Sequence, residues 1–259
     1  MKEFNNADHW NSAAERYENT AHPYTVRYVD AVLAHVPLTP TSRVLDVAAG
    51  TGALALAAAA YGSKVLATDF SPGMVARIAA KGLPNVEARV MDGQALDLPD
   101  ADFDAVFSIF GVFMFPDWRK GLAEMARVTR PGGYGVVAVW QDRGAGAFML
   151  LGQLIRQLFP ERELAAMPQA MTILSTADGL AAELVQAGYR DPYIEHVTRS
   201  FELDMSTLDD LDELFGPSSD WASLDDMKKG MIVAELRSMA GDRSRLPIPS
   251  TALIGVARR

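Results

Sequence analysis

The chain has 259 residues, 49% of them hydrophobic and 22% charged, a composition typical of a folded globular protein and not of a disordered or fibrous one. It has no cysteine, which excludes disulfides, thiolate-bound metals and a cysteine nucleophile. The formal net charge of −9 disfavours binding to the phosphate backbone of DNA or RNA.

The N-terminal residues lack the pattern of a secretory signal. The most apolar uncharged stretch, Ala53–Ala60, is far shorter than the roughly 20 residues that a membrane span needs. We therefore expect a cytoplasmic protein without a membrane span or a nucleic-acid partner. The expected oligomeric state is a monomer or a homodimer.

Two helices are predicted before residue 40. Between Trp10 and Tyr17, apolar residues recur at positions i, i+3, i+4 and i+7, which place them on one helical face. A second helix follows Pro23, and Pro37 ends it.

Strands and helices then alternate as far as Trp140. The strand candidates are Arg43–Ala48, Lys64–Asp69, Asn85–Met91, Asp104–Phe110 and Tyr134–Trp140. Ser71 and Asp117 are predicted to cap two of the intervening helices, and Pro131-Gly132-Gly133 to end the second of them. This alternation predicts an α/β fold with a parallel, doubly wound sheet.

The pattern changes after Trp140. Residues 141–175 contain no clear strand, so we interpret them as a helical insertion that covers whatever the sheet binds. The elements expected further on are a helix capped by Ser175-Thr176, a strand at Pro192–Leu203, a helix over 225–240 and a strand at Thr251–Ala257. The acidic stretch from 202 to 226 is interpreted as a solvated face.

The segment from Val44 to Gly52 places a strand, a glycine turn and a helix start in succession. Glycine lets the backbone turn sharply and approach a ligand closely, and a helix start offers free N–H groups. Asp69 ends the next strand, where a carboxylate can accept hydrogen bonds from a ribose diol. Alone, this arrangement indicates a nucleoside-cofactor site of any kind, because residues 50–55 also fit the loose dinucleotide fingerprint.

Further residues distinguish between cofactors. Asp46 lies in the first strand just before the turn, where it can receive an ammonium group, and Asp92-Gly93 follows the third strand, where a carboxylate can accept the amine of adenine. Together with VLDVAAGTG (44–52), the runs VLATDFSPGM (65–74), MDGQALDLPDADFDAVFS (91–108) and LAEMARVTRPGGYGVVAVW (122–140) resemble the class I S-adenosylmethionine-dependent methyltransferases. The likeness is greatest to small-molecule members similar to the ubiquinone/menaquinone C-methyltransferase group.

This resemblance implies a seven-stranded Rossmann-like sheet whose last strand is antiparallel. It also implies two parts of the chain, an N-terminal helical lid over residues 1–40 and a methyltransferase domain over 41–259 with the cover insertion 141–175. S-adenosylmethionine is the implied cofactor, and S-adenosylhomocysteine the product. The implied cofactor residues are Tyr17, Asp46, Ala48, Gly50, Thr51, Gly52, Asp69, Phe70, Met74, Asp92, Gly93, Gln94, Ser108 and Ile109. Tyr17 and Met74 are also consistent with ordinary core packing.

We predict transfer of a methyl group to a small acceptor, apolar or aromatic, without a metal. The residues predicted to line its site are Phe110, Phe113, Trp140 and Phe148. Of the four histidines, His22 is the candidate general base, and a surface role is its alternative. The acceptor atom, whether O, S, N or C, stays open. Two other functions also stay open, namely an inactive cofactor-binding subunit and a nicotinamide-dependent oxidoreductase.

Overall fold

The computed structural model describes residues 6–141, 146–164, 168–216 and 218–259. The strands of these residues form one seven-stranded sheet in the order β3-β2-β1-β4-β5-β7-β6. They are β1 (Arg43–Val47), β2 (Lys64–Asp69), β3 (Val86–Val90), β4 (Phe103–Ile109), β5 (Thr129–Trp140), β6 (Arg190–Asp204) and β7 (Arg245–Arg258).

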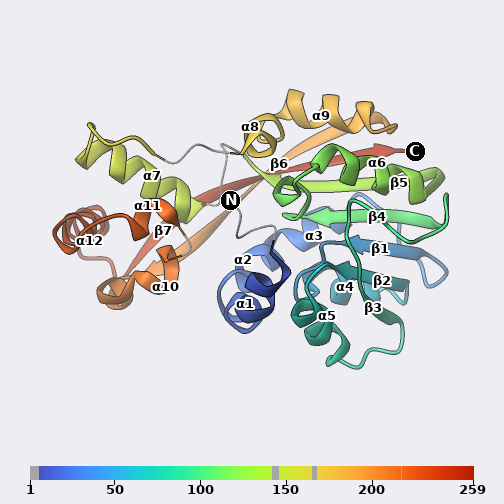
Figure 1. Cartoon of the computed structure of the whole chain (residues 1–259), viewed down its shortest axis with the longest axis horizontal. Helices are drawn as coiled ribbons and strands as arrows, with labels where there is room; N and C mark the ends of the chain where they lie inside the picture. The colour runs from blue at the N-terminus through green and yellow to red at the C-terminus, as the bar shows by residue number, and fades with distance from the viewer. Residues whose placement is uncertain (1–5, 142–145, 165–167, 217) are drawn as a thin grey trace.

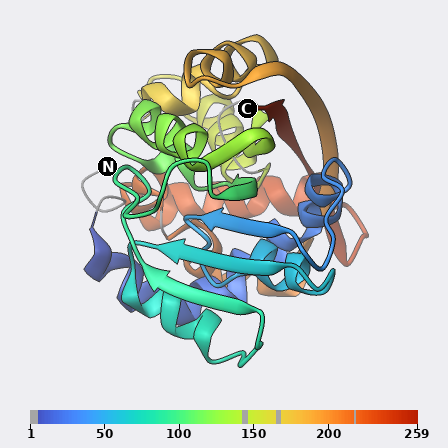
Figure 2. The ribbon, with the colours of Figure 1, turned by 90° about the vertical axis from the view of Figure 1, so that its right-hand side faces the viewer.

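Strands β1 to β5 are parallel, and β7 runs antiparallel to both β5 and β6. Figure 2 shows β1, β2 and β3 side by side and pointing the same way. The predicted α/β class and doubly wound, seven-stranded sheet are therefore confirmed. In one detail the structure differs, because Pro131-Gly132-Gly133 lies within β5 and not before it.

Helices cover both faces of the sheet (Figure 1). Those on one face are α3 (Val29–Leu33), α4 (Ala53–Ala59) and α5 (Pro72–Ala79), and those on the other are α6 (Trp118–Val128) and α9 (Ala177–Gln186). The predicted caps are present at three helix starts. Ser71 Oγ accepts from Met74 N at 3.3 Å, Asp117 from Lys120 N at 3.1 Å and Thr176 from Gly179 N at 3.1 Å.

The N-terminal helix α1 (Ala7–Thr20) is fastened to α5. Asn11 Oδ1 accepts hydrogen bonds from Ser71 Oγ at 2.7 Å and from Gly73 N at 2.8 Å. Glu18 pairs with Arg77, and also with Lys81 at 2.8 Å. The second predicted helix is divided into α2 (His22–Thr25), the 3₁₀ turn η1 (Val26–Tyr28) and α3.

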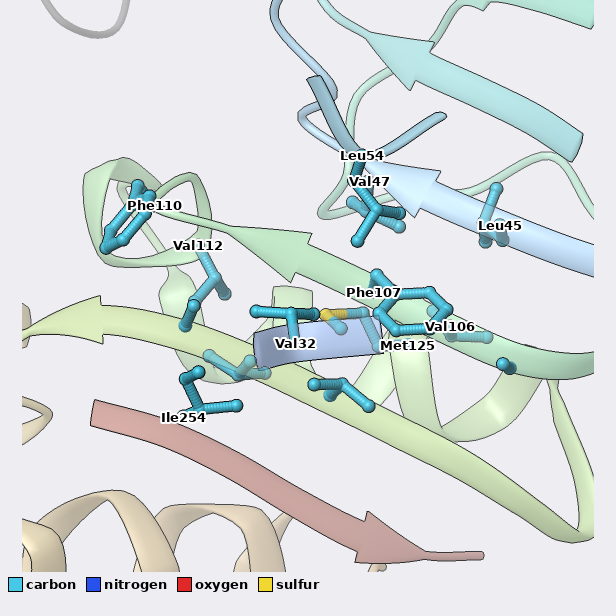
Figure 3. Packing of buried hydrophobic residues seen from close by; sticks show 14 of the residues in the cluster. Val32, Leu45, Val47, Leu54, Val106, Phe107, Phe110, Val112, Met125 and Ile254 are labelled. Carbon is cyan, nitrogen blue, oxygen red and sulfur yellow. The ribbon is translucent and has the colours of Figure 1, made fainter. Parts of the chain in front are cut away.

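The main hydrophobic core lies between the sheet and its helices. Figure 3 labels Val32 of α3, Leu45 of β1, Phe107 of β4 and Met125 of α6, which all belong to this core. All four side chains are fully buried. A continuous core of this kind fixes the ends of the strands, and with them the loops that follow β1, β2 and β4.

Strands β6 and β7 extend beyond this core into a second group of helices (Figure 1). We call this group, with the adjoining halves of the two strands, the distal lobe. Its helices are α7 (Gly146–Leu158), the 3₁₀ helix η4 (Met205–Asp210), α10 (Asp212–Phe215), α11 (Ser219–Ala222) and α12 (Asp226–Ala240). They enclose a second buried cluster that includes Leu154, Leu236 and Ile248.

The interpretation of residues 202–226 as a solvated face holds for exposed acids such as Asp212 and Asp225, but not for the apolar residues between them. Leu208, Phe215 and Trp221 of this acidic stretch are at most 3% exposed, because they belong to the buried cluster of the distal lobe. The predicted insertion is also divided, since α7 packs in the distal lobe whereas α8 (Gln169–Ile173) packs on the 3₁₀ turn η2 (Val112–Met114), which follows β4. Among the described residues, no helix combines the length and apolarity that crossing a membrane requires.

Candidate active site

The glycine turn after β1 has an unusual backbone. Ala48, Gly50 and Gly52 all have positive φ angles, of 56°, 55° and 92°. Two of these positions are occupied by glycine, which tolerates that conformation, whereas Ala48 is strained there. The turn closes with a hydrogen bond from Gly52 N to Ala49 O at 2.9 Å, and α4 begins directly after it.

Two buried carboxylates flank this turn. Asp46 is 1% exposed and accepts a hydrogen bond from Ala55 N at 3.1 Å. Asp69, at the end of β2, accepts from Gly50 N and from Ser71 N, both at 2.9 Å. Asp69 therefore joins the glycine turn to the start of α5, which fixes the positions of the two strand ends relative to each other.

Burial disfavours the charged forms of both carboxylates. It raises the pKa of Asp46 to about 8, with a further contribution from the charge of Asp69, against the opposing hydrogen bond from Ala55. Burial also raises the pKa of Asp69 to about 6, although three backbone N–H groups oppose the shift. Two buried acids of this kind would be stabilised by a ligand that brings a positive charge or hydrogen-bond donors.

A narrow cavity, the turn cavity, lies between the glycine turn and helices α1 and α2. The residues that line it are Tyr17, His22, Thr25, Asp46, Ala48, Ala49, Thr51, Ala53, Leu54 and Ile109. Six of the predicted site residues are thus brought together, from the first two helices, β1 and its turn, and the end of β4. Gly50 and Gly52 belong to the same turn without being among the lining residues.

Tyr17 and His22 form the N-terminal side of the turn cavity. Burial, and secondarily the charge of Asp69, raises the pKa of Tyr17 to about 12, so its phenol is neutral at physiological pH. His22 Nδ1 lies 2.7 Å from Thr51 Oγ1, and burial lowers the pKa of His22. His22 is therefore held beside the glycine turn, and its role as a general base stays a prediction.

The residues predicted at the adenine end lie after β3. Asp92 is exposed, and its Oδ1 accepts from the backbone N and the side-chain Nε2 of Gln94 at 2.9 and 3.0 Å. Gln94 Oε1 in turn accepts from Asp117 N at 2.7 Å. A Cβ at Gly93 would stand 2.6 Å from the ring of Phe115, so packing requires glycine there. These contacts leave the Asp92 carboxylate accessible at the strand end.

The remaining predicted cofactor residues have different surroundings. Met74 is 2% exposed on α5, in keeping with its alternative role in packing, and Phe70 is partly exposed between β2 and α5. Ser108 is fully buried, and its Oγ has no hydrogen-bond partner among the described residues. An unpaired buried hydroxyl is costly and is found at functional sites more often than elsewhere.

A second cavity, the apolar cavity, lies beyond the end of β4. Its lining residues are Phe113, Val139, Trp140, Met171, Leu174 and Ser175. Two predicted acceptor residues, Phe113 and Trp140, therefore share one cavity with residues of the predicted insertion. Phe110 stacks on Trp140 and is not among the lining residues, and the side chain of Phe148 lies outside the described residues.

Several site residues were not predicted from the sequence. Asn11 holds α1 against α5, Thr25 lines the turn cavity, and Met171 and Leu174 line the apolar cavity. Asn11 lies three residues before Ala14 and six before Tyr17 on α1, and that spacing is the only sequence signal it carries. The other three depend on how distant segments pack together.

Comparison with known proteins agrees with this geometry. A family model described as "Methyltransferase domain" matches residues 44–133. The demethylmenaquinone methyltransferase of Mycolicibacterium gilvum is 37% identical over 54% of this chain, and the match spans 57% of that relative's length. The enzyme of the same name from Thermus thermophilus is 35% identical over 64% of this chain and 81% of its own length.

Among solved structures, the YcgJ protein of Bacillus subtilis superposes with a TM-score of 0.61 at 19% identity, over 90% of this chain and 98% of that one. That likeness concerns the fold. The chain belongs to the class I S-adenosylmethionine-dependent methyltransferases, of the menaquinone C-methyltransferase-like kind. S-adenosylmethionine is accordingly its cofactor.

The residues at the turn cavity fit this cofactor. Asp46 would offer a buried carboxylate to an ammonium group, and Asp69 would offer acceptor oxygens at the neighbouring strand end. The phenol of Tyr17 and the carboxylates of both acids lie close enough to influence one another's charge. An aromatic ring at this place also suits a sulfonium, which it attracts through the negative face of the ring.

Proposed function

We propose that this enzyme transfers the methyl group of S-adenosylmethionine to a small aromatic or apolar molecule bound in the apolar cavity. The observation that carries the proposal is the composition of that cavity, which is two aromatic rings, a thioether, two aliphatic side chains and one hydroxyl. The hydroxyl, Ser175 Oγ, donates to Thr172 O at 3.2 Å. Such a lining favours a flat, uncharged ligand.

The position of the cavity supports the same function. In open α/β sheets, ligands bind beyond the carboxyl ends of the strands. Ile109 ends β4 in the turn cavity, Phe113 follows it in η2, and Trp140 ends the adjacent β5. The acceptor would therefore lie next to the cofactor, across the end of β4.

The bound methyl donor supplies a methyl carbon attached to a positively charged sulfur. An acceptor atom would form a bond to this carbon with its own electron pair, while the sulfur would keep the pair of the bond that breaks. An in-line approach requires both molecules to be held in register and water to be excluded. Phe113 and Met171 would hold the acceptor, while Tyr17, on the N-terminal lid, would close the cofactor side.

The proton of the acceptor, where it has one, must leave. His22 is the base we propose for it, because burial lowers its pKa and keeps the imidazole neutral and able to accept a proton. Replacing His22 by glutamine should lower kcat for acceptors with a weakly acidic proton, with less effect on acceptors that are ionised in solution.

The test begins with calorimetric titration of S-adenosylhomocysteine and of NADH, followed by transfer assays with labelled methyl donor. The acceptors are naphthol, naphthohydroquinone and, because relatives are named for it, demethylmenaquinone. We expect Phe113→Ala and Met171→Ala to raise the acceptor KM and to leave S-adenosylhomocysteine binding unchanged. Met231→Ala, an exposed methionine of the distal lobe, is the matched control.

Three results would argue against the proposal. Binding of NADH alone would favour an oxidoreductase. Binding of S-adenosylhomocysteine without transfer to any acceptor would favour an inactive subunit. Transfer with an acceptor KM that neither variant changes would show that the acceptor binds elsewhere.

A further inference from the structure

The ring of Phe110 and the indole of Trp140 form a face-to-face stack. Their centroids are 3.8 Å apart, and the planes differ by 12°. Tyr28 meets both rings edge-on, at 5.4 Å from Phe110 and 5.3 Å from Trp140. The hydroxyl of Tyr28 donates to Ser250 O at 2.8 Å, so this third ring is itself fixed to β7. The indole is thus in contact with two buried rings, and the ring of Tyr24 lies 5.5 Å from it as well.

The two stacked rings have different relations to the apolar cavity. Trp140 lines it together with Phe113 and Met171, whereas Phe110 contacts Trp140 without being among the lining residues. Phe110 is 5% exposed. Its ring therefore reaches this cavity through its contact with the indole.

The backbone of Phe110 is strained. Its φ angle is 56°, which is unfavourable for a bulky residue, and its N–H donates to Ala138 O at 2.8 Å (Figure 3 shows the ring beyond the end of β4). Strain of this kind persists where surrounding contacts fix it, and it concentrates at functional sites. The conformation turns the chain out of β4 and lays the ring on Trp140.

The residue after Phe110 links this strain to the cofactor side. A Cβ at Gly111 would stand 2.6 Å from Ala48 Cβ, so Gly111 packs directly on the glycine turn. Ala48 has the same φ of 56° and lines the turn cavity. Two strained residues at the ends of neighbouring strands, Ala48 after β1 and Phe110 after β4, are therefore connected through Gly111. Ala48 lies beside the turn cavity and Phe110 beside the apolar cavity.

We infer that Phe110 is a positioning residue, which orients Trp140 as a wall of the acceptor site and does not itself touch the acceptor. The inference rests on the proposed function, because it assumes that the apolar cavity holds the acceptor. By fixing the plane of the Trp140 indole, Phe110 would make the acceptor site select flat ligands.

The test uses Phe110→Ala, which removes the ring, and Phe110→Tyr, which restores one. The probe is naphthol, titrated by calorimetry in the presence of S-adenosylhomocysteine. We expect Phe110→Ala to weaken naphthol binding by about 3- to 10-fold, the range expected for one aromatic pair, and Phe110→Tyr to recover it. The affinity for S-adenosylhomocysteine should stay unchanged in both variants.

A spectroscopic readout separates positioning from general stability. The indole N–H resonance of Trp140, identified by its loss in Trp140→Phe, should shift in Phe110→Ala and return in Phe110→Tyr, with no acceptor present. If Phe110→Ala fails to fold by circular dichroism, Phe110→Leu, which keeps bulk without a ring, takes its place.

The outcomes distinguish the two proposals. Loss of naphthol affinity in Trp140→Ala but not in Phe110→Ala would overturn the positioning role and leave the acceptor site in place. Unchanged naphthol affinity in both variants would overturn the acceptor site, and with it the role of Phe110. A Trp140 resonance that does not move in Phe110→Ala would also contradict the positioning role.

Discussion

The phenol ring of Tyr17 lies directly against Gly50, and a Cβ added at Gly50 would stand 3.3 Å from Tyr17 Cε1. The N-terminal helix is therefore seated on the glycine turn with little free space between them. Gly50 N donates a hydrogen bond to Asp69. A displacement of Tyr17 or Gly50 would therefore also move the groups around Asp69.

Gly50→Ala should destabilise the protein more than Gly82→Ala. Both glycines have positive φ angles, of 55° and 66°, so both substitutions cost about 1–2 kcal/mol in backbone strain. Nothing lies within 4 Å of the Cβ position at Gly82, whereas Tyr17 adjoins that at Gly50. The free energy of unfolding in urea measures the difference. In a Tyr17→Ala background the two substitutions should lower the free energy of unfolding equally. A difference that persists there would show that the Tyr17 ring does not cause it.

The stability of the ligand-free protein should depend on the ionisation of Asp46. Because burial raises the folded-state pKa of this group from 3.8 to about 8, the native state holds more protons than the unfolded chain between those pH values. The contribution of Asp46 to stability is therefore fully present below the lower value and is lost as pH rises through the upper one. Asp46→Asn should be more stable than the parent at pH 8 by a few kcal/mol, and by much less at pH 5. Urea unfolding at the two pH values measures it, and a pH-independent difference would contradict it.

Ligand affinity should follow the opposite trend. A cationic ammonium group needs the ionised form of Asp46, whose population rises up to about tenfold per pH unit below its pKa. S-adenosylhomocysteine should thus bind more tightly as pH increases toward about 8, and Asp46→Asn should remove most of this dependence. Calorimetry across this range measures the effect, and an equal slope in the variant would assign the dependence to another group.

Ligand truncation should distinguish the two ends of the cofactor site. Asp46→Asn should weaken S-adenosylhomocysteine by roughly 10- to 100-fold, the value of a hydrogen bond to a charged group, and leave adenosine unaffected. Asp92→Ala, at an exposed carboxylate after β3, should weaken both ligands and leave the free energy of unfolding unchanged. Loss of S-adenosylhomocysteine alone in Asp92→Ala would mean that this carboxylate does not bind the adenine end.

Helix α1 should be held less firmly when its ion pairs to α5 are removed. Glu18, 23% exposed, pairs with both Arg77 and Lys81, whereas Glu15, 82% exposed, lies 3.7 Å from Arg77. Glu18→Gln should cost about 1 kcal/mol of local stability and speed hydrogen exchange in α1, while Glu15→Gln should have little effect. High salt should reduce the difference between the variants. Equal hydrogen-exchange rates of the two variants in low salt would show that Asn11 and the apolar contacts hold α1 without help from the ion pairs.

The part of the fold up to Trp140 follows closely from local sequence signals. The strand predicted at Arg43–Ala48 is found at Arg43–Val47, and Ser71 and Asp117 cap helices as expected. Glycines, caps and runs of β-branched residues specify these elements within a few positions of the chain, so no knowledge of distant contacts is needed.

The distal lobe was not predicted, for a physical reason. Residues 202–226 have an acidic composition that does not indicate burial, although Leu208, Leu211 and Phe215 among them are buried. The spacing of these three residues is helical, but their helices are short and irregular. Their burial depends on α7 and α12, which are far away in the sequence. The stacking of Phe110 on Trp140 was not predicted either, because a contact with a residue of the next strand is not a local property of the sequence.

Strand β7, like its neighbour β6, takes part in both hydrophobic clusters. Leu246 and Ile248 of β7 belong to the distal lobe, and Leu253 and Ile254 to the main core. Since β7 follows the other six strands of the sheet in the chain, neither cluster can be completed before β7 has been synthesised. The apolar surfaces of the main core and of the distal lobe therefore stay exposed until the fourteen residues of β7 pack against them. Nascent chains that stall before Arg245 should accordingly be substrates for chaperones along their whole length.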